Sequence, residues 1–230
     1  TAIYTITSPL HDERSVSEVS NAFIAEIEKA MGSPLIFRGT DYSAYGTDAL
    51  DIIYVRTGGT EGIFRELLPK FGGRILLLTS GKSNSLAASL EILSYLRQQG
   101  RNGEVIHGSP AYIASRIKTL AIVEKARRRL NGCRLGSIGQ PSDWLISSNA
   151  DKEAVRNRLG IEIIEIPIEE LTETALPERE FLLSADVIEL RDKILDQAPK
   201  NVSQYAEGAI RIYAALKDIV ARYRLSGLTL

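Results

Sequence analysis

The chain has 230 residues, of which 44% are hydrophobic, and it carries a formal net charge of −1. That much apolar material can fill a packed core, which excludes an intrinsically disordered chain. The near-zero charge creates no field that would attract nucleic acid or an anionic membrane, and no apolar run reaches the roughly 18 residues that span a bilayer. The single cysteine, Cys133, cannot form an internal disulfide and suits a reducing compartment. We therefore expect a cytoplasmic protein that binds neither nucleic acid nor membranes.

Short apolar runs alternate with helical patterns in the first part of the chain. The expected strands are residues 3–6, 35–37, 51–55, 75–78 and 105–107. Between them, apolar residues recur every three or four positions, as in Val16, Val19 and Phe23, which is typical of the buried face of a helix. The alternation predicts an α/β domain over residues 1–131, with a Rossmann-like open parallel sheet and helices on both faces. A long helical pattern at residues 111–130 is expected to connect this domain to the rest of the chain.

A second α/β unit of the same Rossmann-like kind is expected over residues 132–230. Its strand patterns are residues 135–139 and 161–166, and its helical patterns are 150–159, 184–197 and 202–223. Residues 227–230 have the pattern of a strand that is just beginning. Two convincing strands and the start of a third are fewer than an α/β sheet usually contains. We therefore expect this second domain to be incomplete at its C-terminal end.

The turn after the fourth strand, residues 79–84, has the sequence Thr-Ser-Gly-Lys-Ser-Asn. Its Gly-Lys-Ser is the ending of a phosphate-binding P-loop, but that motif also needs glycine at the position of Leu76, inside the strand. The turn is therefore not a nucleotide loop. Two interpretations stay open. Its serine or asparagine side chains cap the next helix, or Thr79, Ser80, Ser83 and Asn84 face a hydroxyl-rich ligand beyond the carboxyl ends of the strands.

Two further strand-end turns are candidates for substrate binding. In residues 57–61, Thr-Gly-Gly-Thr-Glu, the glycines allow close approach of the backbone, while Thr60 and Glu61 also suit the start of a helix. After the strand at 135–139, the sole tryptophan, Trp144, either stacks on a sugar or pins its loop to the domain interface. The candidate substrate-binding residues are Thr57, Gly58, Gly59, Thr60, Glu61, Ser80, Ser83, Asn84, Asp143 and Trp144.

The sequence offers no catalytic constellation. It contains two histidines and one cysteine, with no C-x-x-C or H-E-x-x-H motif. His11 is followed directly by Asp12 and Glu13, and consecutive residues do not converge on a metal without a tight turn. His107 stands alone at a strand end. We assign no catalytic residue and no metal ligand to the chain.

Five segments carry a family resemblance through their order and spacing. They are residues 51–61 (DIIYVRTGGTE), 80–91 (SGKSNSLAASLE), 135–144 (LGSIGQPSDW), 166–171 (IPIEEL) and 227–230 (GLTL). Together they resemble the N-terminal half of L-fucose isomerase-like proteins, over most of the chain. The resemblance implies two tandem α/β domains followed by a third, which holds a divalent metal, typically manganese. It places the metal ligands beyond the segment at 227–230, so we expect this chain to bind no cofactor itself.

The resemblance also implies a function. It suggests a portion of a carbohydrate isomerase that interconverts aldoses and ketoses through an enediol, with a sugar as substrate and a homo-oligomeric assembly. This chain would supply substrate-side loops and subunit contacts and would be inactive alone. The alternative is a two-lobed sugar or small-molecule binding or sensor module without catalysis, which tandem α/β lobes also suit.

Overall fold

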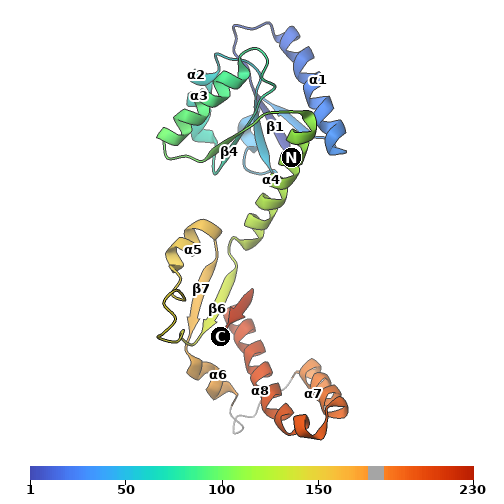
Figure 1. Ribbon diagram of the computed structural model, residues 1–230, viewed down its shortest axis with the longest axis vertical. Coiled ribbons are helices and arrows are strands. Elements are labelled where there is room, and N and C mark those ends of the chain that lie inside the picture. Colours follow the sequence, from blue (N-terminus) through green and yellow to red (C-terminus); the bar gives the residue numbers. More distant parts are fainter. Residues whose placement is uncertain (176–183) are drawn as a thin grey trace. The chain divides into compact units, whose positions relative to one another are not determined.

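The computed structural model describes residues 1–175 and 184–230 (Figure 1). The chain forms two compact units, Thr1–Ala126 and Arg127–Leu230, and helix α4 (Pro110–Leu130) runs from the first into the second. Each unit contains one sheet, with five strands in the first and three in the second, and all recorded strand pairs are parallel. The predicted fold class, α/β with Rossmann-like parallel sheets, is confirmed.

The first unit is built on strands β1 (Ala2–Ile6), β2 (Ile36–Gly39), β3 (Asp51–Val55), β4 (Ile75–Leu78) and β5 (Gly103–Ile106). Their order across the sheet is β2-β1-β3-β4-β5. After β1 the chain adds β2 on one side, and it then returns to build β3, β4 and β5 on the other. The direction of winding therefore reverses between β1 and β3. In open parallel sheets, ligands bind beyond the carboxyl ends of the strands at such a reversal.

Helices cover both faces of this sheet because its strands are apolar on both sides. On one face lie α1 (Glu13–Met31) and α4, and on the other lie α2 (Glu61–Leu67) and α3 (Ser85–Gln98) (Figure 1). The core under α1 and α4 includes Ile3, Ile27, Ile52, Tyr54, Ile113 and Ile117. The core under α2 and α3 includes Ile53, Val55, Phe64, Leu77 and Ile92. Short 3-10 turns at Tyr42–Ala44 and Leu68–Lys70 complete the unit.

Helix α1 has a defined start, end and buried side. It begins after Asp12, whose carboxylate accepts a hydrogen bond from the Ser15 backbone N–H at 2.8 Å, and it ends at Gly32 with φ of 71°. Val16 is buried, but Val19, which the sequence pattern placed on the same face, is 41% exposed. At 3.6 residues per turn, Val19 lies about 60° round the helix from Val16, at the edge of the face that meets the sheet. That prediction was wrong.

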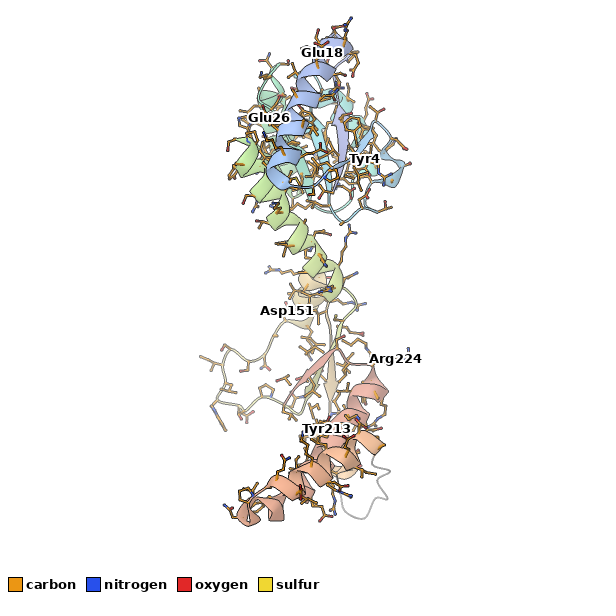
Figure 2. The ribbon with its side chains drawn as sticks, turned by 90° about the vertical axis from the view of Figure 1, so that its right-hand side faces the viewer. Tyr4, Glu18, Glu26, Asp151, Tyr213 and Arg224 are labelled. Atoms are coloured by element: carbon orange, nitrogen blue, oxygen red, sulfur yellow. The ribbon has the colours of Figure 1, made fainter. Side chains whose placement is uncertain are left out.

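The second unit contains strands β6 (Arg134–Ile138), β7 (Glu162–Ile166) and β8 (Gly227–Thr229) in the order β7-β6-β8. Its helices are α5 (Lys152–Leu159), α6 (Ile168–Thr174), α7 (Ala185–Gln197) and α8 (Lys200–Tyr223). The strand expected from residue 227 therefore exists and pairs with β6. Helix α6 was not predicted. Figure 2 shows Asp151, whose carboxylate caps α5, and Tyr213 on α8.

The core of the second unit lies where α8 crosses its sheet, and includes Ile138, Ile166, Ala215, Ile219 and Leu225. A smaller cluster joins α7 to α8 through Val187, Ile210 and Ala214. In the parts of the chain that the structure describes, no helix combines the length and the apolar character that crossing a bilayer requires.

Candidate functional site

The turns that follow the strands of the first unit meet at one edge of its sheet, because all of its strands are parallel. The backbone N–H of Gly58, after β3, donates to the carbonyl of Ser83, after β4, at 2.7 Å. A Cβ added to Gly58 would lie 2.9 Å from the Cβ of Asn84. The backbone N–H of Ser8, after β1, donates to the Thr57 hydroxyl at 3.0 Å. The structure therefore brings the candidate turns at 57–61 and 79–84 into direct contact.

The threonines of the first candidate turn are occupied within the protein. Thr57 and Thr60 are fully buried, and the Thr60 hydroxyl donates to the Thr57 carbonyl at 3.1 Å. Thr60 stands at the N-cap position of α2 but makes no side-chain capping bond. Gly59 is exposed and has φ of 71°, a conformation that favours glycine. The part of this turn that can meet a ligand is therefore the Gly58–Gly59 backbone and the partly exposed Glu61.

The hydroxyl of Thr79, in the second candidate turn, is also used internally. Thr79 is fully buried; its hydroxyl donates to the Ser85 hydroxyl at 2.7 Å and accepts from the Gly81 backbone N–H at 3.1 Å. Ser80 is partly exposed and accepts a 3.3 Å hydrogen bond from the Lys82 backbone N–H. A hydroxyl that accepts one bond keeps its proton to donate. Of these two side chains, Ser80 is the one that remains able to meet a ligand.

A side-chain cap of α3, one of the two interpretations left open for this turn, is not formed by Asn84. Asn84 occupies the N-cap position, but its side chain makes no capping hydrogen bond. An N-cap residue normally has an extended backbone, which brings its side chain over the first turn, whereas Asn84 has φ of 57° and the preceding Ser83 has φ of 50°. The Ser85 N–H instead donates to the carbonyl of Lys82. Two consecutive left-handed residues other than glycine are a strained feature of the kind that gathers at functional sites.

His107, at the end of β5, supports the second candidate turn. Its Nδ1 lies 3.1 Å from the carbonyl oxygen of Thr79. Because a carbonyl can only accept, Nδ1 is the donor in this contact. The ring lies against Gly81, where an added Cβ would come within 2.7 Å of Cε1. His107 had no role predicted from the sequence; in the structure it holds the turn.

Arg56, directly after β3, is a buried cation that was not predicted from the sequence. Its guanidinium donates to the hydroxyls of Ser20 (3.0 Å), Thr7 (3.0 Å) and Ser17 (2.8 Å) and to the Glu13 carboxylate (2.7 Å). The hydrogen bond from Arg56 is the largest cause that holds the pKa of Glu13 below its ordinary value, followed by that from Ser17. The residues of this network come from the position directly after β3, from α1 and from the turn between β1 and α1. It therefore fixes α1 against the end of the strand.

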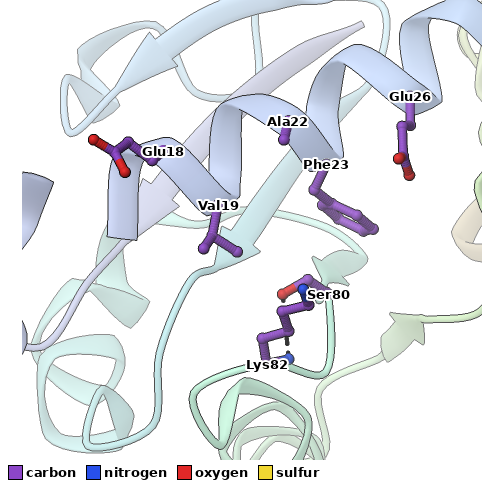
Figure 3. Close-up of a pocket in the computed structure, with 7 residues that line it drawn as sticks. All are labelled: Glu18, Val19, Ala22, Phe23, Glu26, Ser80 and Lys82. Carbon is purple, nitrogen blue, oxygen red and sulfur yellow. Dashed lines mark hydrogen bonds between the residues drawn. The ribbon is translucent and has the colours of Figure 1, made fainter. Parts of the chain in front are cut away.

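A pocket of about 390 Å³ opens between α1 and the second candidate turn (Figure 3). Its volume lies in the range of small-molecule sites, roughly 300–1,000 Å³. Helix α1 contributes Glu18, Val19, Ala22, Phe23 and Glu26, and the turn contributes Ser80 and Lys82. Of these residues, only Ser80 was predicted from the sequence as a candidate for substrate binding. The exposed Val19 is thus part of a pocket wall.

Asp143 and Trp144 belong to the second unit and follow β6. Both are exposed, and Trp144 is 80% exposed. Within its own unit the ring is therefore not packed into a core. Both residues belong to a different unit from the candidate turns at 57–61 and 79–84.

The described residues do not provide a metal centre. Over residues 1–175 and 184–230, no three His, Cys, Asp or Glu side chains form a group that could hold a metal ion. No protein-family model matches the chain, and no curated protein matches it significantly.

Proposed function

We propose that this chain is the substrate-side portion of a cytoplasmic aldose–ketose isomerase of the L-fucose isomerase-like type. In this proposal the first unit presents its carboxyl sheet edge to a sugar, and the protein acts as a homo-oligomer. The observation that carries the proposal is the contact between the turns after β3 and β4, joined by the Gly58–Ser83 hydrogen bond. Two of the segments that resemble the family therefore meet at the edge where parallel sheets bind ligands.

The isomerase reaction needs a base and a metal that polarises two neighbouring oxygens of the sugar. The donor set of the described residues does not fit such a metal, because no suitable group of side chains gathers there. We therefore derive no step through manganese. The part assigned to these residues is binding and orientation of the sugar, which uses hydroxyl and charged side chains at the edge of a rigid scaffold.

The proposal is tested by separating binding from turnover. The 230-residue chain is mixed with L-fucose or arabinose and Mn²⁺; ketose formation is measured, and sugar contact is followed by saturation-transfer NMR. We expect contact in the range of ~1–10 mM, where a few hydrogen bonds give weak affinity, and no ketose. Absence of any aldose or polyol binding would refute a sugar-facing role. Full turnover would refute the assignment of the catalytic centre to residues outside this chain.

The second candidate is a two-lobed binding or sensor module. The observation in its favour is that the chain forms two units, each with its own parallel sheet. Such a module binds its ligand between lobes and closes around it, so small-angle scattering should show a smaller radius of gyration when sugar is added. An unchanged radius at saturating sugar would count against closure and favour the isomerase proposal.

A further inference from the structure

The pocket between α1 and the turn after β4 has polar groups that are not fully engaged in hydrogen bonds or ion pairs within the protein. In the described part of the chain, the Lys82 ammonium and the Glu26 carboxylate make no ion pair, and Glu18 has one contact of 3.5 Å with the highly exposed Arg14. Ser80 keeps its hydroxyl proton free to donate. By contrast, the hydroxyls of Thr57 and Thr79 are buried and bonded internally. Ligand contacts should therefore form in the pocket.

The α1 wall of the pocket has two parallel rows of side chains. Glu18, Ala22 and Glu26 follow each other at four-residue spacing, and Val19 and Phe23 form the neighbouring row. Ala22 leaves a gap between the two carboxylates, which Figure 3 shows on either side of it. Phe23 borders the gap with its ring, and that ring is held by Tyr54 at 5.6 Å between centroids. This side of the pocket is thus apolar in its middle, with a carboxylate that can accept hydrogen bonds at each end.

The pocket presents charges of both signs, two carboxylates and one ammonium, so an ion of either sign meets at least one like charge. An anion would meet the carboxylates of Glu18 and Glu26, and a cation would meet the ammonium of Lys82. A neutral polyhydroxylated ligand avoids both conflicts, because a hydroxyl donates to a carboxylate and accepts from an ammonium. Such charge-assisted bonds are about twice as strong as neutral ones. The C–H groups on one face of a sugar can stack on the electron-rich face of the Phe23 ring.

We infer that a neutral monosaccharide binds in this pocket, with its C–H face on Phe23 and its hydroxyls between Glu18, Glu26 and Lys82. The inference rests on the proposed function, which it deepens by locating the sugar. It moves the binding position from the Gly58–Gly59 turn to the space between α1 and Ser80. It also assigns recognition to a helix that the family-like segments do not include.

Two variants that replace an alanine of α1 by leucine test where the sugar binds. Ala22→Leu fills the gap in the pocket, whereas Ala25→Leu adds the same atoms at an exposed position of the same helix that does not line it. Binding of L-fucose, arabinose and their alditols is measured by NMR titration of the 230-residue chain. Ala22→Leu should weaken binding at least tenfold, and Ala25→Leu should leave the dissociation constant unchanged. Amide spectra of both variants confirm that the fold is retained.

A second pair of variants tests whether the Lys82 ammonium contacts the sugar. Lys82→Gln removes the pocket's ammonium, and Lys118→Gln removes an exposed ammonium from α4. Lys82→Gln should raise the dissociation constant about tenfold, and Lys118→Gln should not change it. If sugars bind but both pocket variants behave like their controls, the pocket is overturned and the proposed function stands. If no neutral sugar binds the unmodified chain, the proposed function itself fails and the pocket assignment fails with it.

Discussion

Replacing Arg56 by methionine tests whether the buried guanidinium holds α1 on the sheet. The side chain of Arg56 is 8% exposed, and it donates to Ser20, Thr7 and Ser17 as well as to Glu13. Hydrogen bonds to a charged group contribute roughly 1.5–3 kcal/mol each. Two effects reduce the total. Removing a buried charge relieves its desolvation, and the Glu13 side chain is 66% exposed, so that its attraction is screened.

We therefore expect Arg56→Met to lower the free energy of unfolding of the first unit by about 2–4 kcal/mol. The sole tryptophan, Trp144, lies in the second unit, so tryptophan fluorescence would follow the wrong part of the chain. Hydrogen exchange of the β1 and β3 amides reports the first unit directly. Arg65→Met, at an exposed position of α2, is the matched control and should stay within about 0.5 kcal/mol of the unmodified chain. An equally small effect of Arg56→Met would refute the role of the network.

The remaining predictions concern a turn, a pH dependence and an ion pair. Gly58→Ala should destabilise the first unit by about 1–3 kcal/mol, because the added Cβ would lie 2.9 Å from the Cβ of Asn84. Gly62→Ala is the control and should not destabilise it, because nothing lies within 4 Å of the Cβ added there. Denaturant-dependent hydrogen exchange compares the two variants. Because the folded pKa of Glu13 is lowered, its contribution is complete above the ordinary value of 4.5 and is lost as pH falls through the lowered value. The stability difference between the unmodified chain and Glu13→Gln should therefore shrink below pH 4.5, and a pH-independent difference would contradict this. The hydrogen bond from Lys217 lowers the pKa of Asp186 to about 2, so Lys217→Gln should return its NMR titration midpoint toward 3.8.

The sheet of the first unit was predictable because its strands have a strong signal. The runs at 51–55 and 75–78 are short, apolar and bounded by turn residues, and the structure places strands over those same residues. Their order in the sheet was not predictable, since alternating strands and helices fit several windings. Helix α6 escaped prediction because its seven residues, Ile168–Thr174, are too few to show a helical period.

The candidate site was predicted in part. The turns at 57–61 and 79–84 do meet, because parallel strands send their following turns to one edge. Which hydroxyls are free could not be predicted, since Thr79 and Ser80 are adjacent in sequence and only one of them is buried. One feature of the sequence could have indicated the role of Arg56. Ser20 interrupts the apolar face of α1 between Val16 and Phe23, and a buried polar residue there calls for a polar partner on the sheet.

The hydroxyls of Thr57, Thr60 and Thr79 are hydrogen-bonded inside the protein, so these residues stabilise the fold at this sheet edge. Other residues at the same edge do not have this role and can vary. A substitution at Ser80 or Lys82 changes what the pocket offers without leaving a buried hydroxyl unpaired. Descendants of this sequence could therefore exchange one ligand for another through a few surface substitutions at little cost in stability. A designer who wishes to change the ligand of this domain has the same freedom, provided that the buried threonines are left as they are.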